Sequence, residues 1–298
     1  MIELTPVVAP LFSGERVLIA ATSISALVLV ALGLTIIFGF MGVINLAHGA
    51  LMMIGAYVAW SLQSAGFSPW IGILVAPVVV GIIGIIIEIG LIRYLYERPI
   101  DTLLATWGVA ILLREGVKIF AGTDNKSVEA PISGSLSAVG MTFPAYWLLI
   151  ILITAFIVGL TVALFKYTDI GIMALAVIEN REMAAAVGIN TAFSDRATFA
   201  FGAALAGFSG AIMAPILSVN AEMGIQWLAD SFLVVIVGGV GTFLGTVIGG
   251  ILIGGLDNIF RTIITGYTAL AQALVLIVAL VIIRYRPDGM VPSKGGSE

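Results

Sequence analysis

Long runs of uncharged, mostly apolar residues constrain this chain more than any other feature of its sequence. A helix needs about 20 such residues to cross the hydrocarbon core of a membrane. Seven runs have this character, and an eighth is apolar at first but carries Arg114, Glu115 and Lys118 toward its end. The eight runs are Val17–Gly39, Val43–Gln63, Trp70–Ile87, Thr102–Ala121, Pro144–Phe165, Ala197–Asn220, Ser231–Leu256 and Thr262–Ile283. The sequence therefore predicts an all-α polytopic membrane protein with about eight or nine transmembrane helices.

The amino-acid composition excludes several other classes of protein. The chain is 60% hydrophobic and 10% charged, whereas a soluble domain is about 45–50% apolar and about 25% charged. Such a chain cannot cover its surface with polar groups in water, which excludes a soluble enzyme, a nucleic-acid-binding protein and a disordered protein. It has no Cys and one His, so we predict no metal site, no catalytic residue and no cofactor bound by this chain. We expect residues 1–298 to form a single transmembrane domain.

The distribution of basic residues predicts how the chain is oriented in the membrane. Lys and Arg are enriched in cytoplasmic loops, and one set of connections holds eight of the 13 basic residues. These eight are Arg93, Arg98, Lys166, Arg181, Arg196, Arg284, Arg286 and Lys294. We therefore predict a cytoplasmic loop at about 166–196 and an external loop at about 122–143.

Two glycine clusters interrupt the apolar runs, one in each half of the chain. Gly39–Gly42 and Gly238–Gly241 both follow an aliphatic stretch, and the second could divide Ser231–Leu256 into a half-helix and a further helix. Glycine-interrupted segments at corresponding places in two halves indicate a transport site, although glycines also permit close helix packing. With nearby polar side chains, they form our predicted substrate pathway. The pathway residues are Gly39, Gly42, Asn45, His48, Thr102, Thr106, Trp107, Gly238, Gly239 and Gly241.

Several ionisable residues within the apolar runs have open roles. His48 either hydrogen-bonds a neighbouring helix or couples transport to protons. Glu88 lies near the cytoplasmic end of its run and either pairs with a neighbouring helix or reaches the interface. Arg114 and Lys118 share a helical face and repel each other unless a carboxylate lies between them. We expect them to have a structural role at a subunit interface rather than to contact substrate.

The predicted cytoplasmic loop contains an amphipathic helix. From Ile170 to Val187, apolar residues surround a polar cluster at Glu179–Glu182, and Gly188 follows as a helix C-terminal residue. A helix lying on lipid normally carries several basic residues on its polar face, whereas this one carries only Arg181. Docking into a cytoplasmic protein fits better. The predicted docking residues are Glu179, Asn180, Arg181, Met183, Ala184 and Gly188.

The same loop carries a resemblance to a known family. Residues 176–191 (AVIENREMAAAVGINT) resemble the coupling loop of ABC-importer permeases in the branched-chain amino acid and urea group. Gly39–Tyr57 is similar to the early signature of that group, Val237–Gly249 to its late signature, and Arg286–Gly289 to its C-terminal ending.

This resemblance implies an ATP-driven importer of the bacterial cytoplasmic (inner) membrane, in which the chain forms half of the translocation pathway. The implied partners are a paralogous permease subunit, two ATP-binding subunits, a periplasmic or lipid-anchored substrate-binding protein, and membrane lipid; no nucleic acid is implied. The chain has no G-x-x-x-x-G-K-[ST] phosphate loop. ATP is therefore expected to bind the partner subunits.

Three segments favour urea or a short amide as substrate. Arg98–Gly108, Asn180-Arg181 and Asp230–Val235 are more similar to the urea permeases of the group than to those for leucine-type amino acids. The alternative is a branched-chain amino acid, whose two charges ask for a helix terminus or ion pairs. A stand-alone secondary transporter or channel would also suit the glycine breaks, but it has no need for the loop helix. An intramembrane enzyme has no supporting motif.

Overall fold

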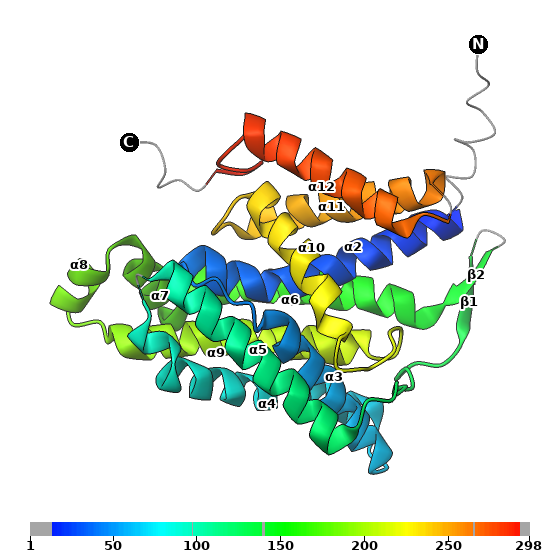
Figure 1. The fold of residues 1–298 in the computed structure, drawn as a ribbon, viewed down its shortest axis with the longest axis horizontal. Helices are drawn as coiled ribbons and strands as arrows, with labels where there is room; N and C mark the ends of the chain where they lie inside the picture. Colours follow the sequence, from blue (N-terminus) through cyan, green and yellow to red (C-terminus); the bar gives the residue numbers. More distant parts are fainter. Residues whose placement is uncertain (1–13, 97, 139–140, 265, 293–298) are drawn as a thin grey trace.

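The protein is a bundle of long helices in which short polar connections gather at two opposite ends (Figure 1). The computed structural model describes residues 14–96, 98–138, 141–264 and 266–292. The long helices are α2 (Gly14–Leu34), α3 (His48–Ser64), α4 (Pro69–Gly90), α5 (Pro99–Ala121), α6 (Ala145–Tyr167), α9 (Thr191–Met213), α10 (Met223–Gly238), α11 (Phe243–Ile263) and α12 (Thr268–Tyr285). The shorter elements are the π-helix η2 (Thr35–Phe40), the 3-10 helix η3 (Ile92–Tyr94), α7 (Asp169–Glu179), α8 (Arg181–Ala186), β1 (Ser135–Ala138) and β2 (Met141–Pro144).

Six of the described helical segments are long and apolar enough to cross a membrane. They are α2 with η2, α4 with η3, α6, α9, α11 and α12. Helices α3 and α10 are shorter, with 17 and 16 residues, and α5 carries charges in its C-terminal half. The predicted all-α polytopic fold is confirmed, and the count of eight or nine crossings stays a prediction for α3, α5 and α10.

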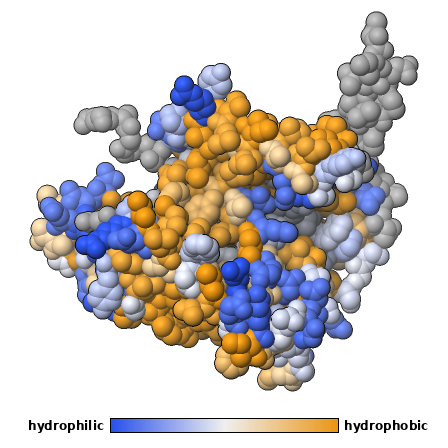
Figure 2. Space-filling view, viewed as in Figure 1, coloured by the Kyte–Doolittle hydropathy of each residue, from blue (hydrophilic) through white to orange (hydrophobic). Residues whose placement is uncertain are grey.

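The two ends of the bundle differ in what they carry. One end, here called the α8 pole, holds α7, α8 and the C-terminal end of α12; the other, the hairpin pole, holds the β1–β2 hairpin (Figure 1). Figure 2 shows apolar side chains over the middle of the visible face and hydrophilic ones toward the ends. Loops 166–196 and 122–143 thus lie at opposite poles, although residues 139, 140 and 294 fall outside the described part.

Small residues let the helices of the core approach one another closely. Helix α9 lies at the centre, packed against α2, α3 and α4. A Cβ added at Gly55 on α3 would overlap the backbone of Gly207 on α9, and one at Gly210 would overlap the carbonyl of Met52. Without a hydrophobic force between helices in lipid, such close backbone packing is a main source of cohesion.

The late glycine cluster divides an apolar run, as expected. Ser231–Leu256 is not one helix, because α10 ends at Gly238 and α11 begins at Phe243. Gly239 and Gly241 between them have positive φ angles of 119° and 79°, which glycine adopts at little cost. The early cluster, Gly39–Gly42, has a different effect, because α2 continues into η2 up to Phe40. The next helix, α3, starts at His48, five residues after Val43, where the apolar run begins.

Two further expectations need correction. The amphipathic segment Ile170–Val187 is two helices, because Asn180 ends α7 and begins α8. The Asn180 side chain accepts a hydrogen bond from the Met183 N–H at 2.9 Å, which is the bond of a helix N-cap. The second concerns the loop at 122–143, whose external position stays a prediction: β1 and β2 form an antiparallel hairpin there, which the apolar pattern did not predict.

Candidate functional site

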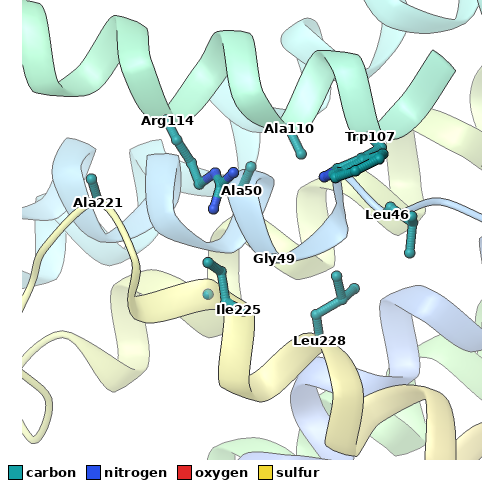
Figure 3. A pocket seen from close by; sticks show the side chains of 10 residues that line it. Leu46, Gly49, Ala50, Trp107, Ala110, Arg114, Ala221, Ile225 and Leu228 are labelled. Carbon is teal, nitrogen blue, oxygen red and sulfur yellow. The ribbon is translucent and has the colours of Figure 1, made fainter. Parts of the chain in front are cut away.

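A cavity of about 210 Å³ lies between α3, α5 and α10. Figure 3 shows Trp107, Ala110 and Arg114 reaching toward it from α5, with Ala50 on α3 and Ile225 on α10 across from them. Its lining residues are Leu46, Gly49, Ala50, Trp107, Ala110, Arg114, Ala221, Gly224, Ile225 and Leu228. Most of these side chains are small or aliphatic, so the cavity is an apolar space with one cationic group in its wall.

Two glycines bring α3 and α10 together beside this cavity. A Cβ added at Gly49 would overlap the carbonyl oxygen of Gly224, and one added at Gly224 would overlap that of Gly49. The two helix backbones therefore touch at this point, which small residues alone permit. Because the glycines have no side chains, space is left between α3, α10 and the larger residues of α5.

Arg114 belongs to a cluster of four charged side chains next to the cavity. Its Nη1 donates to Glu222 Oε2 at 3.0 Å, while Lys118 Nζ lies 2.8 Å from both Glu222 Oε1 and Glu115 Oε1. The hydrogen bond from Lys118 lowers the pKa of Glu222, and the Arg114 charge acts in the same direction. Glu222 is the carboxylate that lets Arg114 and Lys118 share one helical face. The predicted interface role misses that Arg114 also lines the cavity.

The predicted polar pathway residues are mostly used to hold the backbone in place. Thr106 Oγ1 donates to the Ile44 carbonyl at 3.0 Å and accepts from the Leu46 N–H at 3.1 Å. Thr102 Oγ1 donates to the carbonyls of Leu95 and Arg98. These threonines fix the segment before α3 and the first turn of α5, so they position the cavity wall rather than line it.

His48 and Asn45 are fully buried beside this wall. His48 Nε2 lies 2.9 Å from the Val30 carbonyl oxygen on α2, which is the interhelical bond of the structural alternative. Asn45 Oδ1 accepts from the Ala47 N–H at 3.0 Å, and its Nδ2 has no hydrogen-bond partner in the described structure. Of the predicted polar pathway residues, Trp107 lines the cavity.

The two glycine breaks meet in space, away from this cavity. Gly39 lies against the backbone of Gly241, and Phe40 packs against Phe165 at the end of α6, with ring centroids 5.2 Å apart. The breaks thus lie toward the α8 pole. Met290 and Val291 donate backbone hydrogen bonds of 2.9 Å to the carbonyls of Val237 and Gly238, so the segment after α12 packs on the late break.

Two glycines of the second break are closely packed. A Cβ added at Gly238 would overlap the Gly245 carbonyl, and one at Gly239 would overlap the Val291 carbonyl. By contrast, Gly42 has φ of 66° and nothing within 4 Å of an added Cβ. The role of these glycines as pathway residues stays a prediction, and Gly42 is the one among them with open space beside it.

The loop at 166–196 exposes most of the residues predicted to dock. Met183 is 61% exposed, and Glu179, Asn180 and Gly188 are also exposed. Gly188 has φ of 92° and donates to the Ala185 carbonyl at 3.0 Å, as expected of a glycine after a helix C-terminus. Ala184 is a correction, because it is only 4% exposed and packs beneath the loop.

Arg181 is held by the transmembrane body. Its guanidinium pairs with both oxygens of Asp195 on α9, at 3.2 and 2.7 Å, and lies 5.2 Å from the ring centroid of Tyr96. The Tyr96 hydroxyl donates to Glu88 Oε1 at 3.2 Å. Burial raises the pKa of Tyr96, as do the nearby charges of Asp195 and Glu88, so the hydroxyl keeps its proton. Glu88 thus pairs with the segment after its own helix, and Arg181 links α8 to α9.

These features define the class of protein, a multi-pass permease of the inner membrane that serves transport rather than catalysis. A family described as "Branched-chain amino acid transport system / permease component" matches residues 16–283, and the chain belongs to that family. The protein is similar to the high-affinity branched-chain amino acid transport system permease protein LivH of Salmonella typhimurium, with 28% identity over 90% of this chain and 91% of the relative.

Two further relatives show how widely the sequence similarity extends. LivH of Escherichia coli (strain K12) is 30% identical over 77% of this chain and 80% of the relative. The ribose import permease protein RbsC of Haemophilus influenzae is 27% identical over 92% of this chain and 86% of the relative. No solved structure matches the chain. Relatives named for different substrates are similar in sequence to this chain over most of its length, so the substrate has to be argued from the residues of the site.

Proposed function

We propose that this chain is a permease subunit of an ATP-driven importer for hydrophobic α-amino acids of the branched-chain kind. Its family description and the relatives named LivH support this proposal over urea. The observation in the structure that carries it is the chemistry of the cavity between α3, α5 and α10. Aliphatic walls suit an aliphatic side chain, and a single guanidinium suits a carboxylate.

Urea fits the same cavity less well. Urea is a planar molecule with four N–H donors and one carbonyl acceptor, yet none of the ten lining side chains carries a hydrogen-bond acceptor. A polar ligand whose donors find no acceptors loses binding free energy on leaving water. The threonines expected to bind an amide are occupied with backbone carbonyls.

The importer is proposed to contain further subunits. A paralogous permease would complete the pathway, one of two ATP-binding subunits would dock on the α7–α8 loop, and a substrate-binding protein would deliver the amino acid. Support comes from the family and from exposed apolar side chains at the α8 pole, among them Met183 and Val187, which are 61% and 70% exposed. Exposed apolar groups on a polar loop are typical of a surface that a partner protein covers.

Uptake into vesicles tests the proposed substrate. The complete complex would be reconstituted with its binding protein, with ATP supplied on the side of the ATP-binding subunits. We expect ATP-dependent uptake of leucine, isoleucine and valine, and no ATP-dependent uptake of urea above the rate without ATP. Uptake of urea with no uptake of the three amino acids would show that the proposed substrate is wrong.

A further inference from the structure

The cavity between α3, α5 and α10 contains N–H groups that lack an acceptor. Arg114 Nε is buried and has no hydrogen-bond partner among the described residues. Trp107 precedes Arg114 by seven residues, or about two turns, so both side chains leave the same face of α5. Figure 3 shows the indole and the guanidinium directed into the cavity from two ends. No hydrogen bond of the Trp107 indole appears among the described residues.

The charge of Arg114 is balanced within a cluster of two cations and two carboxylates, but Arg114 does not have a carboxylate to itself. Glu222 also binds Lys118, and Lys118 binds Glu115 as well, so Arg114 shares a single carboxylate with a second cation. A buried donor without an acceptor carries a desolvation penalty, which an anionic oxygen placed in the cavity would remove.

Resting on the proposed function, we propose that Arg114 binds the carboxylate of the transported amino acid inside this cavity. The buried Nε donates to one carboxylate oxygen, and the Trp107 indole N–H lies at the other end of the space. The aliphatic side chain of the substrate lies along Ala50, Ala110 and Ile225. The site selects amino acids with a free carboxylate and a short aliphatic side chain.

Substitutions at two positions on one helix distinguish this role from a general effect of charge. Lys118 lies one turn after Arg114, carries the same charge and bonds to the same Glu222, but it does not line the cavity. In the reconstituted complex, Arg114→Gln should lower the rate of leucine uptake at least tenfold, and Arg114→Lys should recover part of the loss. Lys118→Gln should leave the rate within about twofold of wild type.

A substitution in the apolar wall provides a measurement that a purely structural role of Arg114 would not affect. Ala110→Val narrows the cavity, so it should lower leucine uptake at least threefold relative to alanine uptake, compared with the same ratio in wild type. The carboxylate site is wrong if Arg114→Gln and Lys118→Gln have equal effects, or if Ala110→Val leaves the leucine-to-alanine ratio unchanged. A wild-type complex that imports no leucine would instead overturn the proposed function, and the carboxylate site with it.

Discussion

Gly39 and Gly241, which are 202 positions apart, lie directly against each other: a Cβ added at Gly39 would be 2.5 Å from the Gly241 backbone nitrogen. This contact joins the end of η2 to the turn between α10 and α11. Each glycine belongs to one of the two clusters that interrupt the apolar pattern. The clusters are therefore the two sides of one close backbone contact near the α8 pole.

This contact predicts that a single methyl group added at Gly39 destabilises the protein. Gly39→Ala should lower the melting temperature of the purified complex by several degrees, because overpacking typically costs about 1–3 kcal/mol. Gly255→Ala on α11 is the matched control, since nothing lies within 4 Å of its added Cβ. The control should be neutral or slightly stabilising. Equal melting temperatures for both variants, measured by thermal unfolding in detergent, would contradict the close contact.

Substitutions of Gly42 distinguish a role in helix packing from a role in gating the pathway. Its positive φ of 66° makes any other residue strained there, but its surroundings are open. Gly42→Ala and Gly42→Leu carry the same backbone cost and differ in bulk alone. If Gly42 lines the pathway, the Leu variant should take up substrate at least tenfold more slowly than the Ala variant at equal complex yield. Equal uptake by the two variants would remove Gly42 from the pathway.

The Arg181–Asp195 pair predicts loss of coupling rather than loss of docking. Arg181→Gln frees α8 from α9 and leaves the Asp195 side chain, which is 8% exposed, without the guanidinium that binds both its oxygens. ATP hydrolysis should continue while substrate uptake per ATP falls severalfold. Adding Asp195→Asn should restore part of the uptake per ATP, because this substitution removes the buried charge of Asp195. Arg196→Gln, at the same pole, should leave the uptake per ATP within about twofold of wild type. An equal loss of uptake per ATP in Arg196→Gln and Arg181→Gln would indicate a general effect of charge.

The exposed part of the coupling loop should bind the ATP-binding subunits. The double substitution Glu179→Ala and Met183→Ala removes one carboxylate and one largely exposed apolar side chain. It should lower uptake more than tenfold and reduce copurification of the ATP-binding subunits. Glu182→Ala on the same loop removes an exposed carboxylate outside the predicted docking set and should behave as wild type. Normal uptake by the double variant would place docking elsewhere.

The orientation predicted from basic residues can be measured directly, since the chain has no Cys. Ser133→Cys places a thiol in the external loop, and Glu182→Cys places one on α8, both at exposed positions. In intact cells, a membrane-impermeant maleimide should label the first and leave the second unlabelled until the cells are opened. Labelling of Glu182→Cys alone in intact cells would reverse the orientation.

The comparison of sequence and structure is clearest for the helices and their breaks. Apolar runs of about 20 residues define helices because the backbone in lipid has to satisfy its own hydrogen bonds. Asn180, Gly188 and the glycines at 238–241 mark real helix ends, because caps and positive φ angles depend on residues close in the sequence. The resemblance of these segments to permeases also identified the family.

The cavity depended on tertiary structure, because its walls look like any apolar helix surface. Gly49 and Gly224, on helices far apart in the sequence, create the space by touching, and no local pattern pairs them. Arg114 looked like part of a repulsive pair until Glu222, 108 positions later, came within 3.0 Å. Likewise, Arg181 lies in an exposed loop, yet Asp195 holds it to the bundle. Sequence determined which segments enter the membrane, since that depends on local hydrophobicity; packing decided which side chains face one another, since that depends on contacts between distant helices.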